Sequence, residues 1–430
     1  MLKAGVSQVD ITPPLGVGMR GYFEERTATT VHDPLHVRSF ALESGSGAVA
    51  VAVCDLIGLQ RQYVDRTKER IAAATGLRPE QVMISCTHTH TGPHTGDDDY
   101  TRFLIGRIAD GVRMAWDRRE PALVGWGRGA ESRVVFNRRY RMKDGSVQTN
   151  PGLGNPEVIE PAGPVDPEVG VLELRRCDGR TIGLLANYAL HYVGIPEDRQ
   201  AISADYYGFF AASMQRLIGG AGDLVAALAN GASGDLNNLD VLGNARPRND
   251  RYQHTERVAA VVAAAAFWGR NEAQFTDDVA LGSALAEVTL EPRSAPAPDE
   301  LARATAIEAR VTAGQRVLMG ERSFARRVRR TAAHPAEPYT TVVQALRIGD
   351  LGVASAPGEL FVELGLAIKQ RSPFGQTLVL ELGNDSVGYI PTARAFEEGA
   401  YEPESSPYAP GFGEAIAETA VRLLEGLRDE

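Results

Sequence analysis

The stretch that decides the fold and the chemistry of this chain is Ser85-Cys86-Thr87-His88-Thr89-His90-Thr91-Gly92-Pro93-His94. The apolar run Val82-Met83-Ile84 stands before it and predicts a buried strand. Gly92-Pro93 cannot continue a strand, so the chain must turn there. We therefore expect a strand that delivers imidazoles at its carboxyl end, which is where α/β sheets usually bind ligands.

His88 and His90 are two residues apart. On an extended strand, their side chains would point to the same side. Such a pair can share a metal ion, or one imidazole can bind the metal while the other moves protons. A polar loop with surface histidines is the alternative interpretation, and the rest of the chain has to decide between the two.

Length, composition and charge exclude several classes of protein. The 430 residues suffice for one large domain or for two to three ordinary ones. Hydrophobic residues make up 43% and charged residues 23%, which is typical of a soluble globular protein. The net charge of −10 argues against nucleic-acid binding, and no apolar run reaches membrane-spanning length. We expect a small-molecule partner, no nucleic acid and no membrane span.

The cysteines and the N-terminus indicate the compartment. There are three cysteines, Cys54, Cys86 and Cys177, which are too few and too widely spaced for a disulfide framework or a cysteine zinc site. The first six residues lack the charged and apolar regions of a signal peptide. We expect a reducing compartment, the cytoplasm.

Local patterns along the chain predict an α/β fold, with mixed β-sheets, flanking helices and a metal site at strand carboxyl ends. Strands are expected at 4–12, 37–42, 48–53, 169–174, 181–188, 224–229, 280–290, 340–348 and 377–382, and helices at 61–74, 100–116, 201–218, 255–268 and 412–427. Residues 150–168 are rich in Pro and Gly and predict a long loop. We expect one domain over residues 1–430, with a helical excursion at 298–335.

Three further strand ends carry polar residues. His191 follows the strand at 181–188, either as a metal ligand or as a core histidine bonded to the backbone. Glu359 follows Pro357-Gly358, either as a ligand or as the first carboxylate of a helix, worth roughly 0.3–1 kcal/mol there. Asn237 lies in a loop of small and amide residues that offers hydrogen-bond donors to an oxyanion.

Two basic runs stand out in the sequence. Arg138 lies in residues 136–143, which predict either a solvated hairpin or an arginine that clamps an oxyanion. The run Arg326-Arg327-Val328-Arg329-Arg330 ends the helical excursion. We interpret it as a solvated face or as a contact in a homo-oligomer, which the sequence leaves open.

These motifs, in this order, resemble the catalytic part of the neutral/alkaline (non-lysosomal) ceramidases and their bacterial relatives, along nearly the whole chain. Thr87-His88-Thr89-His90-Thr91-Gly92-Pro93 is similar to the family's THTHSGP motif, the most specific of the set. The other matching segments are Val9-Asp10-Ile11-Thr12, Asn137-Arg138, Asn187 with His191, Ile202-Ser203-Ala204-Asp205, Pro357-Gly358-Glu359, and Gly388-Tyr389 with Tyr401.

The resemblance implies a set of site residues. Zinc would be held by His88, His191, Glu359 and Tyr389, while His90, Arg138 and Tyr401 would line the site. The sequence also departs from the family, since Asn237 stands where the family's GDxSPN loop carries a serine implicated in catalysis. We also expect it to lack the immunoglobulin-like domain of secreted ceramidases.

The leading hypothesis is a zinc-dependent hydrolase, a ceramidase-like amidase that cleaves an amide-like bond of a soluble small molecule with a zinc-activated water. His90 would shuttle the proton, Tyr401 would stabilise the oxyanion together with zinc, and Arg138 would hold an anionic group of the substrate. Two alternatives stay open. One is a zinc-dependent lyase, isomerase or lactonase on a sugar-like substrate, and the other is a non-catalytic zinc protein.

Overall fold

Two β-sheets pack face to face in the computed structural model, which describes residues 1–45, 47–193, 199–219, 224–243, 252–334 and 337–429. The larger sheet has nine strands, in the order β16 (Val225–Asn230), β14 (Thr181–Tyr188), β13 (Glu168–Arg176), β8 (Glu120–Ala130), β1 (Lys3–Asp10), β5 (His36–Ser44), β6 (Gly47–Cys54) and β7 (Val82–Cys86), with β18 (Gln274–Thr276) beside β8. The smaller sheet has four, in the order β19 (Leu281–Leu290), β20 (Tyr339–Ile348), β21 (Leu351–Ser355) and β23 (Gln376–Leu380).

Apolar side chains fill the space between the two sheets. Phe40 and Val51 of the larger sheet belong to the same buried cluster as Val353 and Leu378 of the smaller one. Because successive residues of a strand face opposite sides, each sheet also offers an apolar outer face that needs a cover. The strands therefore read as long apolar runs rather than as clean alternations.

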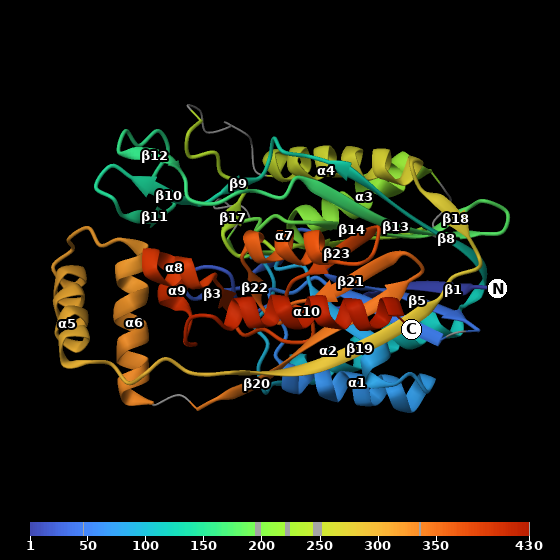
Figure 1. Ribbon diagram of the computed structural model, residues 1–430, viewed down its shortest axis with the longest axis horizontal. Helices are drawn as coiled ribbons and strands as arrows, with labels where there is room; N and C mark the ends of the chain where they lie inside the picture. The colour runs from blue at the N-terminus through green and yellow to red at the C-terminus, as the bar shows by residue number, and fades with distance from the viewer. Residues whose placement is uncertain (46, 194–198, 220–223, 244–251, 335–336, 430) are drawn as a thin grey trace.

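Helices cover both outer faces (Figure 1). The larger sheet is covered by α1 (Arg61–Thr75), α2 (Asp99–Asp117), α3 (Asp205–Ile218) and α4 (Gln253–Asn271), and the smaller sheet by α7 (Val362–Arg371) and α10 (Phe412–Asp429). The predicted α/β class, with mixed sheets and flanking helices, is confirmed. Among the described helices, none combines the length and the apolar character needed to cross a membrane.

The segment predicted as a helical excursion contains α5 (Pro298–Thr312) and α6 (Met319–Ala333). The two helices pack against each other at the end of the molecule opposite to both termini in the view of Figure 1. The last residue of the predicted range, 335, lies outside the described residues. The single domain over residues 1–430 stays a prediction.

The remaining elements of the described chain are short. They are β2 (Gly18–Met19), β3 (Arg26–Thr27), β4 (Thr30–Val31), η1 (Pro79–Gln81), β9 (Phe136–Asn137), β10 (Arg139–Met142), β11 (Val147–Thr149), β12 (Val158–Pro161), β15 (Ala201–Ile202), β17 (Leu236–Asn237), β22 (Glu359–Leu360), β24 (Tyr389–Ile390), α8 (Ala393–Glu398) and α9 (Tyr401–Ser405).

One local expectation from the sequence was wrong, and one of the two interpretations left open for Glu359 is excluded. Residues 150–168 are not wholly a loop, because β12 pairs antiparallel with β10. Glu359 does not begin a helix, because it lies in β22 and α7 starts only at Val362. Both findings concern short strands that exist only through pairing with another segment, so local patterns carry no signal for them.

Candidate functional site: a buried histidine centre

The ends of β7, β16 and β23 meet, which brings distant segments to one place. The backbone N–H of Cys86 donates to the carbonyl of Leu382 at 3.3 Å, and that of Glu381 donates to the carbonyl of Asn230 at 3.1 Å. Residues that follow these strands are therefore held side by side. Strand ends of this kind are where α/β proteins place functional groups.

His88 reaches the centre from a backbone conformation that the sequence did not predict. The strand ends at Cys86, and His88 has a φ of +68°, in the left-handed region, so the alternation of an extended strand does not apply. Its Nδ1 lies 2.7 Å from the carbonyl oxygen of Ile57. Since a carbonyl only accepts, Nδ1 carries the proton, and Nε2 presents its lone pair to the centre.

His90 is positioned through its backbone. Its N–H donates to Oδ2 of Asp205 at 2.9 Å, and the Thr89 hydroxyl donates to the same oxygen at 2.9 Å. Burial raises the pKa of Asp205 to about 6. The sequence pointed to Asp205 only as a residue in the first turn of a helix and as part of a family motif, so its role in holding this loop was missed.

His191, three residues past the end of β14, completes a group of three imidazoles. One ring nitrogen from each of His88, His90 and His191 lies within 4.8 Å of the others. The ring centroids are 4.5 Å apart for His88 and His191, and 4.9 Å apart for each pair that includes His90. The structure thus brings together all three predicted histidines.

Glu359 faces two of these rings. Its Oε2 lies 3.4 Å from Nε2 of His88 and 3.5 Å from Nδ1 of His191. Glu359 is paired with Tyr389 across the parallel strands β22 and β24, which places the Tyr389 residue beside it. The four predicted metal ligands are therefore drawn from four separate segments that converge.

The buried donors of the centre fit a metal ion. Among the described residues, both ring nitrogens of His90, Nδ1 of His191 and Oε2 of Glu359 are buried without a hydrogen-bond partner. An unpaired buried polar group costs about 1–3 kcal/mol, so this concentration requires an explanation. Nitrogen and oxygen donors of this kind are the usual ligands of Zn²⁺.

Burial also sets the charge of the histidines. Desolvation, reinforced by the charges of His88 and Arg138, holds the pKa of His90 well below its ordinary value. Desolvation also holds the pKa of His191 well below its ordinary value, and the charge of Arg138 is the second cause. For His88, burial acts in the same direction, but the Glu359 carboxylate outweighs it and raises its pKa. Neutral imidazole is the form that binds a metal, so the lowered pKa suits His191 to that role.

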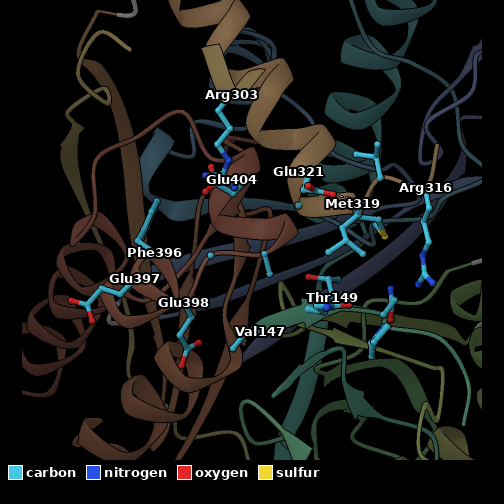
Figure 2. Close-up of a pocket in the computed structure, with 18 residues that line it drawn as sticks. Val147, Thr149, Arg303, Arg316, Met319, Glu321, Phe396, Glu397, Glu398 and Glu404 are labelled. Carbon is cyan, nitrogen blue, oxygen red and sulfur yellow. Dashed lines mark hydrogen bonds between the residues drawn. The ribbon is translucent and has the colours of Figure 1, made fainter. Parts of the chain in front are cut away.

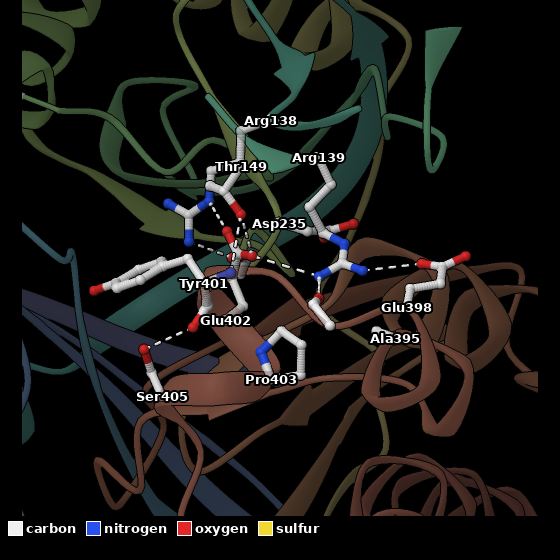
Figure 3. A network of polar contacts seen from close by, with 12 residues as sticks. Arg138, Arg139, Thr149, Asp235, Ala395, Glu398, Tyr401, Glu402, Pro403 and Ser405 are labelled. Carbon is white, nitrogen blue, oxygen red and sulfur yellow. Dashed lines mark hydrogen bonds and ion pairs between the residues drawn. The ribbon is translucent and has the colours of Figure 1, made fainter. Parts of the chain in front are cut away.

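Arg138 is buried and its charge is balanced inside the protein (Figure 3). Its Nε donates to Oε1 of Glu402 at 2.7 Å, and Nη2 donates to the carbonyl of Gly234 at 2.7 Å. The other oxygen of Glu402 accepts from the Thr149 hydroxyl at 2.8 Å. The guanidinium lies 5.2 Å from the centre of the Tyr389 ring. The predicted role of Arg138 in holding a substrate anion stays a prediction.

Glu402 was missed in the sequence, although it directly follows Tyr401. Tyr401 opens α9, and its ring lies edge-on to Tyr389 at 5.4 Å. Burial raises the pKa of Tyr401, so the phenol stays protonated at neutral pH and can donate a hydrogen bond. Glu402 thus anchors the segment that positions Tyr401.

Asn237 makes its hydrogen bonds outside the histidine centre. It lies in β17, where its Nδ2 donates to Oδ1 of Asn150 at 2.7 Å and its own Oδ1 accepts from the N–H of Leu239 at 3.0 Å. Within the described part of the chain, no hydrogen bond of Asn237 reaches the three histidines. Its predicted catalytic role stays a prediction.

A cavity of about 470 Å³ lies behind the Tyr401 segment, between β11, α6 and α8 (Figure 2). Glu321, Glu398 and Glu404 line it, and each is paired with an arginine, Glu321 with Arg310 at 2.6 Å, for example. None of the three histidines is among the described residues that line it. This cavity is a polar packing space rather than the entrance to the centre.

The fold and the centre together define a class, a mixed α/β protein with a buried histidine group fit for a metal ion. No protein-family model matches the chain. The neutral ceramidase of Pseudomonas aeruginosa is 23% identical, over 99% of this chain and 72% of that protein. The neutral ceramidase of Mycobacterium tuberculosis is 25% identical, over 100% of this chain and 77% of that protein.

Solved structures show the same fold. The crystal structure of the Pseudomonas aeruginosa neutral ceramidase has a TM-score of 0.78, with 19% identity, over 100% of this chain and 74% of that one. A ceramidase complexed with C2 has a TM-score of 0.77. The chain is a relative of the neutral ceramidases, as the motifs of its sequence predicted.

Proposed function

We propose that this protein is a zinc-dependent hydrolase that cleaves an amide bond of a soluble small molecule. The observation that carries the proposal is the convergence of His88, His191 and Glu359, whose facing atoms lie 3.4 and 3.5 Å apart in a buried place. The relationship to the neutral ceramidases, named for the cleavage of an amide-linked lipid, supports the reaction type.

The residues that would hold zinc are His88, His191, Glu359 and Tyr389. A bound zinc ion supplies a Lewis acid and lowers the pKa of a water ligand towards about 7. The hydrogen bond from Nδ1 of His88 to the carbonyl of Ile57 fixes the ring, which leaves Nε2 available to a bound ion.

The remaining side chains would handle the proton and the developing charge. His90 is buried, with both ring nitrogens free of hydrogen bonds to described residues, and its lowered pKa keeps it neutral. It would therefore hold a proton only transiently, which suits passing one on rather than storing it. Tyr401 keeps its phenolic proton and can donate to the substrate's carbonyl oxygen as negative charge develops there. The buried pair of Arg138 and Glu402 would hold Tyr389 and Tyr401 in place.

The test measures metal content, turnover and product mass together. We expect about one zinc per chain in the wild type, and loss of both zinc and turnover in His191→Ala. His94→Ala is the matched control, since this histidine belongs to the same motif but lies outside the histidine group. His90→Ala should keep its zinc and lose turnover, which separates proton transfer from metal binding.

Product mass identifies the reaction. Hydrolysis adds one water across the amide and yields an acid and an amine. Products whose masses sum to that of the substrate would instead support a lyase, and a single product of unchanged mass would support an isomerase. Full activity in metal-free protein would overturn the proposal.

We also propose a cytoplasmic location. All three cysteines are free thiols, and Cys177 is exposed, which suits a reducing compartment. Cell fractionation with detection of the native protein tests this proposal.

A further inference from the structure

A cavity of about 490 Å³ opens beside the histidine centre, between the N-terminal loop, α6 and α9. Tyr22 and Tyr401 both line it. The Tyr22 ring lies edge-on to His90 at 6.0 Å, and the Tyr401 ring lies edge-on to Tyr389 at 5.4 Å. The inner wall of this cavity is therefore in contact with the proposed catalytic residues.

The outer wall carries several arginines. Ser323, Arg326, Arg327 and Arg330 follow one another at the spacing of a single helical face, and all four line the cavity from α6. Arg20 adds a further guanidinium from the N-terminal loop. The sequence interpretation of the arginine run as a solvated face or an oligomer contact was incomplete, since part of it borders this cavity.

These arginines fall into two kinds. Arg327 is buried and pairs with Glu404 at 3.0 Å, so it has a structural partner. Arg20, Arg326 and Arg330 are exposed, and within the described ranges no carboxylate oxygen lies within 4.0 Å of their guanidinium nitrogens. In a chain whose net charge is −10, three such cations at one cavity form a local positive rim.

An aromatic side chain links the rim to the inner wall. The Phe23 ring is 62% exposed and lies edge-on to Tyr401 at 5.8 Å, with the Arg326 guanidinium 5.9 Å from its centre. The cavity thus offers the aromatic rings of Phe23 and Tyr401 next to the reacting end and cations at its mouth. This combination matches a molecule with an apolar acyl group and an anionic group.

We propose that the substrate is an acylated amide that carries a carboxylate or a similar anion, and that Arg20, Arg326 and Arg330 bind this anion. The inference rests on the proposed function, because it assigns the substrate class of the same centre. Guanidinium groups bind carboxylates by charge-assisted and often bidentate hydrogen bonds. A flat anionic membrane surface is the less suitable partner, because the arginines border a cavity whose other wall is the proposed site.

The test compares amides that differ only in charge. N-octanoylglycine carries a carboxylate, and N-octanoylglycinamide is its neutral counterpart; N-octylsuccinamic acid places the carboxylate on the acyl side. We expect the wild type to prefer at least one of the anionic amides. Arg326→Gln and Arg330→Gln should each reduce kcat/KM for that substrate roughly five- to tenfold, mainly through KM, and so reduce the preference for charge.

Arg322→Gln is the matched control, because this arginine is exposed on the same helix and does not line the cavity. It should leave the preference for the anionic amide as in the wild type. The proposal is overturned if anionic and neutral amides are cleaved equally well, or if the Arg322 variant loses as much as the other two.

Calorimetric binding of N-octanoylglycine separates this inference from the proposed function. Binding that weakens in Arg326→Gln without any hydrolysis in the wild type would support the anion site and contradict the hydrolase. Absence of both binding and hydrolysis would overturn both. Binding to vesicles of phosphatidylglycerol and of phosphatidylcholine completes the test. If Arg326→Gln weakens only the binding to vesicles, the arginines belong to a membrane surface and the proposal is overturned.

Discussion

At the scale of the residue, the centre depends on a few buried contacts that fix each functional side chain. His88 is held by Ile57, the His90 loop by Asp205, and Arg138 by Glu402. In each case, a specific hydrogen bond satisfies a polar group that would be unfavourable when buried alone. The loss of a partner should therefore cost more than the loss of a comparable contact at the surface.

Glu402→Ala should destabilise the fold strongly. Glu402 is fully buried, and its removal leaves the Arg138 guanidinium buried without its counter-ion. Breaking such a pair costs about 3–5 kcal/mol, which urea unfolding measures. Glu418→Ala, which breaks the exposed pair with Arg371, is the control and should leave the midpoint unchanged. Equal midpoints for both variants would contradict the importance of this pair.

Asp235 should make stability depend on pH. Burial raises its pKa from 3.8 to about 6, while its Oδ1 accepts from the N–H of Val362. Between about pH 4 and 6, the folded protein keeps a proton that the unfolded chain releases, so the free energy of unfolding falls as pH rises, by at most ~3 kcal/mol.

Asp235→Asn should reduce this fall when unfolding is measured across the same window. Asp205, whose pKa is also raised to about 6, contributes a fall of its own in both proteins, so the comparison is with the wild type. If the free energy of unfolding of the variant falls with pH as steeply as that of the wild type, Asp235 does not titrate in this window.

At the scale of the element, helices are held against the sheet at close distances. A Cβ added to Gly129 of β8 would lie 2.0 Å from the carbonyl oxygen of Ala265, and one added to Gly127 would lie 2.2 Å from that of Gly269. Both acceptors belong to α4, so these two glycines allow the helix backbone to approach the strand. The spacing between α4 and the sheet is set by the absence of these side chains.

Gly129→Ala should therefore push α4 away from β8, at a cost of about 1–3 kcal/mol. Gly426→Ala in α10 is the matched control, because a Cβ there meets no atom within 4 Å. Alanine favours a helix over glycine by about 0.5–1 kcal/mol, so this control should be neutral or stabilising. Thermal unfolding of both variants checks the prediction. A Gly129→Ala variant with the Tm of the wild type would contradict it.

The sequence predicted the elements well where their signal is local. The helix expected at 100–116 spans Asp99–Asp117, and the strand expected at 280–290 spans Leu281–Leu290. Hydrophobic periodicity depends only on neighbouring residues, so it is readable in a single chain. The short strands β12, β22 and β24 were not predicted, because each exists only through pairing with another segment.

The site shows the same division. The motif around His88 and His90 indicated the centre, and the strand ends before His191 and Glu359 offered two further candidate ligands. Only Tyr389 came from the resemblance to a family alone. The left-handed backbone of His88 and the buried partner of Arg138 were not predictable, since both follow from packing between distant segments. The arginines of α6 were visible as a run, but their place beside Tyr401 was not.

At the scale of the whole molecule, the proposed metal ligands come from four segments, so a bound ion would connect both sheets. Binding to the folded state alone stabilises it by about 4 kcal/mol when the ion is present at a thousand times its Kd. For a chain of this length, we expect a chelator to lower Tm by about 3–5 °C. His191→Ala should have a Tm that the chelator does not change, and an equal shift in that variant would place the metal elsewhere.

The most direct test of the central claim is an anomalous difference map of zinc-loaded crystals, recorded at the zinc absorption edge. The account predicts one strong peak between Nε2 of His88, Nδ1 of His191 and Oε2 of Glu359, at about 2.0–2.2 Å from each. A peak bound to other residues, or no peak in crystals of active protein, would contradict it.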